Sequence, residues 1–284
     1  HVTLEQLKLH ERFAGIQKLA LLGMGAAPGI TNILARYAAD RLEKVTEIHC
    51  RVGSMDASKY FPKPALAVSY TLATILEEFS MPPAVFTKGK MTFVEAMSGD
   101  KPHRFPSPIG IRKPMYTIHS EVATLAPSYA PKGVKEVSFK IAFDPEFTDR
   151  VRFLRDFGFA DKEPRRIGDV SVRPIDVVNF VAMNQPPSKM LGKMKQYEVV
   201  RSIVKGTERG KKVTYVVDCH TAGLPQWGLG LDVDTGCPPA IAAQMLVKGE
   251  ITEVGALPAE KCVPPEIFFK YLKQRKMKVI VTKK

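Results

Sequence analysis

A glycine-rich turn between an expected strand and an expected helix is the place where residue types and spacing best suit binding chemistry. The apolar run Leu19–Leu22 predicts a short buried strand, and the segment 30–40 has the periodicity of a helix. Between them the chain reads Gly-Met-Gly-Ala-Ala-Pro-Gly at 23–29. Backbone N–H groups at a helix N-terminus lack partners and favour anions, so a turn of this kind can hold a phosphate.

The turn departs from the dinucleotide fingerprint G-x-G-x-x-G at its third glycine. Gly23 and Gly25 fit the first two positions, but Pro28 occupies the third and Gly29 comes one residue late. The acidic residue expected about 20 positions further on would be Glu47, which lies inside the next expected strand rather than at its end. Three interpretations stay open: a phosphate-binding turn, a tight turn with a proline near the helix start, and a turn that faces substrate or cofactor across a cleft.

Several polar residues elsewhere could carry chemistry. Thr31 and Asn32 open the helix, where they could either bind a substrate carboxylate or cap the helix. His119 lies in an expected helix, and an unperturbed imidazole pKa of about 6.5 suits a general base, although it could equally be a partly exposed residue. Arg104 and Arg112 lie in a basic loop that is long enough for a lid, and they could clamp a carboxylate.

The sequence does not predict a metal centre, a hydrolase or a kinase. Its four cysteines lack C-x-x-C spacing, which excludes the common zinc patterns and is typical of a reducing cytoplasm. Asp232 and Asp234 have no third acidic or histidine ligand at metal spacing. There is no P-loop, no nucleophile elbow and no H-E-x-x-H.

Composition indicates a globular protein with an excess of positive charge. Hydrophobic residues make up 45% of the 284, and no apolar run is long enough for a membrane span. The net charge of +13 could serve nucleic acid, attract anionic small molecules, or simply solvate the surface. Because the basic stretches are not interleaved with aromatic residues, we do not expect a nucleic-acid partner.

The patterning predicts a fold of the α/β and α+β classes. Helices are expected at 4–12, 30–40, 72–79, 116–125, 172–183, 238–248 and 264–276, with another beginning after Asp144; strands are expected at 19–22, 45–52, 68–71, 134–143, 197–205, 212–219 and 278–282. Segments 53–64 and 98–114 are expected to be loops. The result is a remnant of a parallel nucleotide-binding sheet plus a mixed-sheet α+β domain.

Five motifs, in order along the chain, resemble those of the saccharopine dehydrogenase-like oxidoreductases. They are Gly-x-x-Pro-Gly-Ile-Thr-Asn at 25–32, Leu-Ala-Val-Ser-Tyr-Thr at 66–71, Gly-Val-Lys-Glu-Val-Ser-Phe at 133–139, Asp-Thr-Gly-Cys-Pro-Pro at 234–239 and Gly-Ala-Leu-Pro-Ala-Glu at 255–260. This group includes saccharopine reductases, lysine 6-dehydrogenases and carboxynorspermidine dehydrogenases. The ordered set covers most of the chain.

The resemblance implies hydride transfer between NADP or NAD and a carbon bonded to nitrogen in an amino acid or polyamine. Ser69 and Tyr70 match the family's aromatic-serine strand and could line the substrate pocket, where Tyr70 could donate a proton or be simply a core aromatic residue. The residues that the resemblance places near the cofactor are Gly25, Pro28, Gly29, Thr235 and Gly236. Ala27 stands where saccharopine-forming members would be expected to carry a carboxylate, which argues against saccharopine itself.

The resemblance also suggests a division of the chain. Residues 1–41 would end a dinucleotide-binding domain, 42–235 would form a substrate and dimerisation domain, and 236–284 would return to the first. The family's own G-x-G-x-x-G would lie upstream of His1, so we expect a C-terminal fragment that is inactive alone. We further expect a cytoplasmic homodimer; the alternative is a non-catalytic ligand-binding or dimerisation domain of the same family.

Overall fold

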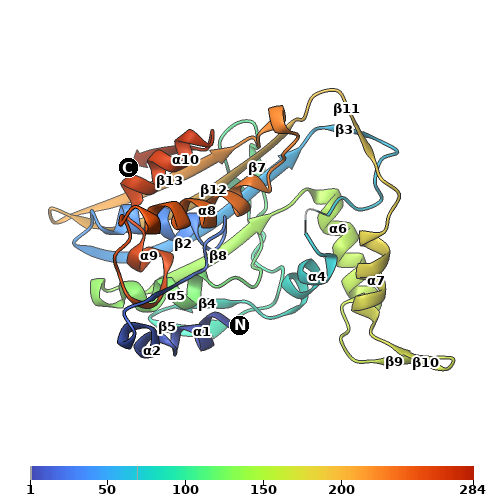
Figure 1. Cartoon of the computed structure of the whole chain (residues 1–284), viewed down its shortest axis with the longest axis horizontal. Helices are drawn as coiled ribbons and strands as arrows, with labels where there is room; N and C mark the ends of the chain where they lie inside the picture. The colour runs from blue at the N-terminus through green and yellow to red at the C-terminus, as the bar shows by residue number, and fades with distance from the viewer. Residues whose placement is uncertain (1, 69) are drawn as a thin grey trace.

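A mixed β-sheet forms the centre of the molecule in the computed structural model, which describes residues 2–68 and 70–284 (Figure 1). Its strands follow the order β15 (Lys278–Lys283), β13 (Lys211–Thr221), β12 (Gln196–Glu208), β2 (Lys44–Asp56), β8 (Glu136–Ala142), β4 (Ala84–Thr87) and β5 (Lys90–Phe93). Only β2 and β8 pair in parallel in this sheet. The mixed sheet and the predicted hairpin of β12 and β13 are confirmed.

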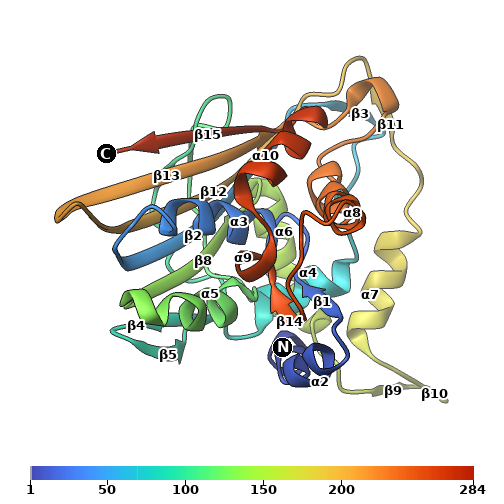
Figure 2. The same cartoon turned by 60° about the vertical axis from the view of Figure 1, so that its left-hand side comes forward.

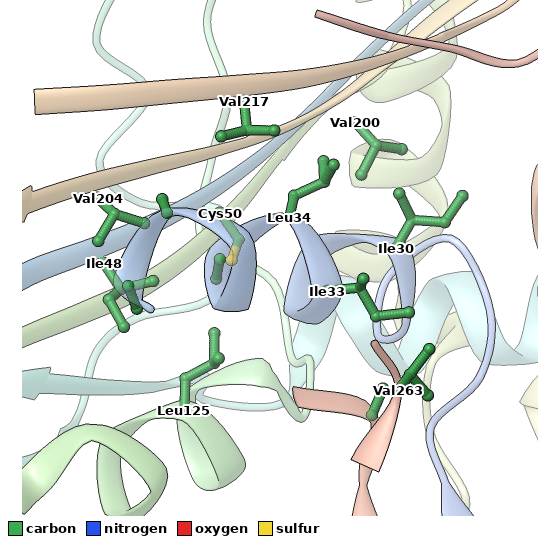
Figure 3. Packing of buried hydrophobic residues seen from close by; sticks show 14 of the residues in the cluster. Ile30, Ile33, Leu34, Ile48, Cys50, Leu125, Val200, Val204, Val217 and Val263 are labelled. Atoms are coloured by element: carbon green, nitrogen blue, oxygen red, sulfur yellow. The ribbon is translucent and has the colours of Figure 1, made fainter. Parts of the chain in front are cut away.

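Helix α3 (Ile30–Ala39) packs its apolar residues against one face of this sheet. Ile30, Ile33 and Leu34 are fully buried, and Figure 3 shows them between Val200 of β12 and Val263. Helices α5 (Glu121–Tyr129) and α10 (Pro265–Gln274) cover the same face, as Figure 2 shows, while α8 (Val233–Val247) packs on α10. Burial of this apolar surface is the main force that fixes α3 on the sheet.

A second sheet is small and parallel. Strand β1 (Leu19–Leu22) pairs with β14 (Gly255–Pro258), although the two are far apart in sequence. Helices α1 (Val2–Leu7) and α2 (His10–Gly15) precede β1, and α9 (Ala259–Cys262) follows β14. The expected remnant of a parallel sheet is therefore present, but its second strand was not predicted.

A separate apolar core joins three helices beyond the sheet. Helices α4 (Leu72–Ser80), α6 (Pro145–Leu154) and α7 (Pro174–Met183) contribute Leu76, Phe79, Val151 and Ile175 to it. The strands β9 (Arg165–Ile167) and β10 (Val170–Val172) project beyond α7 (Figure 1). The remaining elements are β3 (Lys59–Phe61) paired with β11 (Lys189–Leu191), β6 (His103–Arg104) paired with β7 (Ile111–Arg112), and the short helices η1 (Ala130–Lys132), η2 (Arg155–Phe159) and η3 (Pro225–Trp227).

The structure corrects several predicted boundaries. The helix expected at 116–125 begins at Glu121, because the backbone of Tyr116 bonds to Met97 and Ser98. The described part of 68–71 is not a strand: Thr71 caps α4 by accepting a bond from the Thr74 amide. The expected helix 4–12 is two short helices, and α8 begins five residues before its predicted start. The expected loops 53–64 and 98–114 hold the end of β2, β3, and the β6–β7 pair.

Candidate functional site

The glycine-rich turn before α3 is closed by hydrogen bonds within itself. Gly25 N–H donates to the carbonyl of Pro28 at 2.8 Å, and Ile30 N–H donates to that of Gly25 at 2.8 Å. Thr31 N–H donates to the carbonyl of Ala26 at 3.1 Å. The amides that a phosphate would need at this helix N-terminus therefore already have partners.

Gly29 is the residue that makes this closure possible. Its φ is +129°, and a Cβ there would lie 2.2 Å from the carbonyl oxygen of Gly25. Its N–H donates to Asn32 Oδ1 at 3.0 Å, so the side chain of Asn32 ties the turn to the helix. The geometry favours the tight-turn interpretation over a phosphate cradle.

The start of α8 lies beside this turn. A Cβ on Gly25 would lie 3.8 Å from Thr235 Cγ2, whereas a Cβ on Gly236 would meet no atom within 4 Å. The structure thus brings Gly25 and Thr235 together, with open space at Gly236. These are residues for which the sequence suggested contact with a cofactor.

Thr31 and Asn32 are buried at the N-terminus of α3 and bond to groups of other elements. Thr31 Oγ1 lies 2.9 Å from Glu121 Oε1 and 3.2 Å from Asn32 Oδ1. Asn32 Nδ2 donates to Thr124 Oγ1 at 3.1 Å and to Glu260 Oε2 at 2.9 Å. Both side chains therefore hold other protein groups, which leaves positioning as their structural role.

Glu121 and His119 form the most buried titratable pair of the site. Glu121 Oε2 lies 3.7 Å from His119 Nδ1, and both Glu121 Oε2 and His119 Nε2 are buried without a hydrogen-bond partner. Burial raises the pKa of Glu121 to about 8 and lowers the pKa of His119 to about 4. The His119 ring stacks on Phe139, with ring centroids 3.8 Å apart. At neutral pH the carboxyl group is therefore protonated and the imidazole is neutral.

A second group of carboxyls lies on the same side of the sheet. Tyr70 donates to Glu78 Oε2 at 2.9 Å, and burial raises the pKa of Glu78 to about 7. Burial also raises the pKa of Glu198 and of Asp234, and Asp234 raises that of Glu198 further by charge and a hydrogen bond. The charge of Glu78 also raises the pKa of Glu121, so the two carboxyl groups sense each other. Together the two groups make up the candidate site.

No lysine or arginine in the described part of the chain pairs with Glu78, Glu121, Glu198 or Asp234. Burial is the main cause of the raised pKa values, since it disfavours the charged form, and neighbouring carboxylates raise these pKa values further. The arrangement favours a ligand that brings positive charge, because such a ligand lets these carboxyl groups ionise.

Arg104 and Arg112 do not belong to this site. They lie on β6 and β7, which cover the opposite face of the sheet, where the carbonyl of Arg104 accepts a bond from Arg201 at 3.0 Å. Neighbouring residues on a strand point to opposite faces, and Ser202 contacts α3 through the carbonyl of Thr31. The expected carboxylate clamp is therefore wrong in its position. Ser69 lies outside the described residues.

Sequence reasoning missed Glu78, Glu198 and Glu260. A signal was present for Glu198, which shares the inward phase of Val200 and Ser202 on a strand that alternates. Glu260 closes the last family motif but was given no role. No group of three or more His, Cys, Asp or Glu residues suited to a metal is found within 2–68 and 70–284. None of the described helices is long and apolar enough to cross a membrane.

Comparison with known proteins gives a consistent result. Residues 25–280 match the model of the saccharopine dehydrogenase C-terminal domain. The chain is 20% identical to carboxyaminopropylagmatine dehydrogenase of Synechocystis over 91% of its length and 64% of that protein. It is 24% identical to carboxynorspermidine synthase of Vibrio cholerae over 91% of its length and 62% of that protein. The chain thus spans less than two thirds of these relatives.

Two solved structures share the fold. Apo saccharopine dehydrogenase (L-Glu forming) of Saccharomyces cerevisiae matches 98% of this chain and 76% of that one, with a TM-score of 0.70 and 13% identity. Homospermidine synthase of Legionella pneumophila, solved in complex with NAD, matches 94% of this chain and 64% of that one, with a TM-score of 0.62 and 12% identity. At these low sequence identities, the similarity shows a shared fold and nothing further.

Proposed function

The chain belongs to the saccharopine dehydrogenase family through that family's C-terminal domain, and from this premise we propose that it is the substrate-binding part of an NAD(P)-dependent oxidoreductase. The substrate is an amino acid or polyamine, and the reaction takes place at a C–N bond. Within this proposal, residues 1–41 and 236–284 adjoin the cofactor domain and residues 42–235 hold the substrate. The names of both sequence relatives support a polyamine-like substrate.

The observation that carries the proposal is the set of unpaired carboxyl groups. Glu78, Glu198 and Asp234 have raised pKa values and no cationic partner among the described residues. An alkylammonium group supplies the missing positive charge and donates hydrogen bonds, so the carboxyls ionise as it binds. The chain is basic as a whole, and this acidic site therefore stands out as selective for an amine.

A nicotinamide cofactor, when bound, would accept or supply the hydride. In this proposal the glycine-rich turn does not cradle the cofactor's pyrophosphate, because the amides of Gly25, Ile30 and Thr31 donate to carbonyls of the turn and that of Gly29 donates to Asn32. Instead, Gly25, Pro28 and Gly29 form a tightly packed turn that would border the cofactor. Thr235 lies next to this turn, and there is open space at Gly236.

Proton transfer at the reacting nitrogen falls to His119 and Glu121 in this proposal. The neutral imidazole has an unpartnered Nε2, and the protonated carboxyl of Glu121 lies beside its other nitrogen. Thr31 holds Glu121 in place through a hydrogen bond, and Asn32 in turn bonds to Thr31. Tyr70 serves as a further proton donor whose hydroxyl is held by Glu78.

Binding of a linear diamine tests the proposal. The melting temperature of the chain is measured with increasing 1,3-diaminopropane, against potassium chloride at matched ionic strength. We expect the diamine to raise it, and Glu198→Gln and Asp234→Asn to abolish the rise. Asp176→Asn, an exposed acid of α7, is the matched control and should retain it. An effect of diamine equal to that of chloride would remove the basis of the proposal.

The alternative, a non-catalytic dimerisation domain, draws support from a different surface. Phe153, Phe157 and Phe180 are each more than 60% exposed on α6, η2 and α7, and the rings of Phe153 and Phe157 stack. Exposed apolar surface of this extent marks contact sites. A homodimer through these residues is compatible with either function, and sedimentation of Phe157→Ser against the unmodified chain tests it.

A further inference from the structure

Three basic residues stand side by side on the sheet face opposite α3. Lys140 of β8 is in register with Arg51 of β2, and Arg51 is in register with Arg201 of β12. Like charges at directly opposite positions in a sheet destabilise it. Such a row needs negative charge close by.

The protein supplies that charge to only one member of the row. Arg201 makes a bidentate pair with Asp218, at 2.6 and 2.9 Å. Neither Arg51 nor Lys140 forms an ion pair with any residue that the structure describes. Arg51 Nη1 donates to the carbonyls of Cys50 and Ser138 and to Ser138 Oγ, which leaves its Nε and Nη2 without a protein acceptor. Two positive charges are thus uncompensated.

The loop that carries β6 and β7 covers the row. Lys140 donates to the carbonyl of Gly99 and lies 4.0 Å from the centre of the Tyr116 ring. A Cβ on Gly99, whose φ is +71°, would lie 2.6 Å from that ring, so only glycine permits this approach. His103 Nε2 lies 3.1 Å from Arg201 Nη1.

The titration of these groups reflects their crowding. Burial and then the charge of Arg51 lower the pKa of Lys140 to about 8; Lys101 lowers it further, and only Asp100 opposes. Burial lowers the pKa of Arg51 to about 10. Burial and the charge of Arg201 lower the pKa of His103 to about 4. An anion among them would raise all three pKa values, because it favours the charged forms.

We propose that a small doubly charged oxyanion of the phosphate class binds to Arg51 and Lys140 beneath the loop 98–104. Its charge matches the two uncompensated cations, and the free donors of Arg51 suit the geometry of phosphate oxygens. The site lies on the other side of the sheet from Thr31, Glu121 and the carboxyl group of Glu198. It therefore neither depends on the proposed oxidoreductase function nor shares residues with it.

Inorganic phosphate is the probe for this site. The melting temperature of the full chain is measured in increasing phosphate at constant ionic strength set by potassium chloride. We expect a rise of about 3 °C or more, since a ligand that binds only the folded state stabilises it. Arg51→Met and Lys140→Met should abolish the rise, whereas Lys212→Met, an exposed lysine of β13, should keep it. Malonate in place of phosphate distinguishes a phosphate site from a general dianion site.

The variants also report on the repulsion itself. In the absence of a divalent anion, the melting temperatures of Arg51→Met and Lys140→Met should be no lower than that of the unmodified chain, because each substitution removes an uncompensated charge. If a variant does not fold, binding is measured on the unmodified chain alone. The chain should broaden the phosphorus-31 signal of phosphate, and an excess of sulfate should reverse the broadening. A phosphate effect no larger than that of chloride, or one that survives in both variants, would overturn the proposal.

Discussion

Thr31 Oγ1 lies 2.9 Å from Glu121 Oε1 and 3.2 Å from Asn32 Oδ1, and all three residues are buried. A hydroxyl carries one proton and can donate to only one of these oxygens. Asn32 Oδ1 already accepts from Gly29 N–H, and Asn32 Nδ2 is a donor elsewhere. A protonated Glu121 resolves the arrangement, because it donates to Thr31 while Thr31 donates to Asn32. The raised pKa of Glu121 agrees with this proton assignment.

Replacement of Glu121 by Gln should flatten the pH dependence of stability. The folded pKa of about 8 exceeds the unfolded value of about 4.3, so the folded state holds the proton longer and stability falls as pH rises between these values. From pH 6.5 to 8 the unmodified chain should lose about 2 kcal/mol more than Glu121→Gln. His119 does not interfere, since its contribution is confined to pH values below about 6.5.

Urea unfolding of both proteins at several pH values measures this difference. Parallel stability curves for the two proteins would show that Glu121 is ionised in the folded state and that the assigned network is wrong.

Gly29→Ala should strongly destabilise the chain. Its φ of +129° and the approach of its missing Cβ to the Gly25 carbonyl at 2.2 Å leave no room for a side chain. Gly249→Ala is the matched control, because Gly249 also has a positive φ, +67°, but no atom within 4 Å of the added Cβ. The control should cost about 1–2 kcal/mol, and Gly29→Ala clearly more. Equal urea midpoints for the two variants would show that the turn is not closed as described.

NADH and NADPH should bind poorly to the 284-residue chain. Trp227 is 70% exposed on η3, which precedes α8 along the chain, and its fluorescence serves as the readout. Because the amides of Gly25, Gly29, Ile30 and Thr31 already have acceptors in the turn and helix start, we expect no saturable quenching at micromolar concentrations of either nucleotide. N-acetyltryptophanamide serves as the control for absorption of light by the nucleotide. Saturable micromolar quenching would mean that residues 23–29 hold the dinucleotide after all.

Local signals in the sequence predicted local structure well. The cap Asp144 with Pro145 begins α6 as expected, and the alternation of β12 and β13 gave the hairpin. Strand β14 escaped prediction because four residues that end in proline carry little periodicity. Its partner β1 lies far away in sequence, and only the folded chain brings the two together.

The candidate site was predictable only in part. Thr31, Asn32, Tyr70 and His119 do lie on one side of the sheet, whereas Arg104 and Arg112 lie on the other. The sequence does not specify the face that a loop covers, because this depends on the register of β2, β8 and β12. Glu78 comes from α4 and Glu198 from β12, and neither stands in a motif that marks it.

Proton release on amine binding is the most direct test of the central claim. Calorimetric titration of the chain with 1,3-diaminopropane near pH 7, in buffers of different ionisation enthalpy, counts the protons exchanged. If the amine binds by ionising Glu78, Glu198 and Asp234, protons should leave as it binds, with about half a proton from Glu78 alone near pH 7. Glu198→Gln combined with Asp234→Asn should abolish both binding and release. Binding without proton release, or no binding at all, would contradict the account.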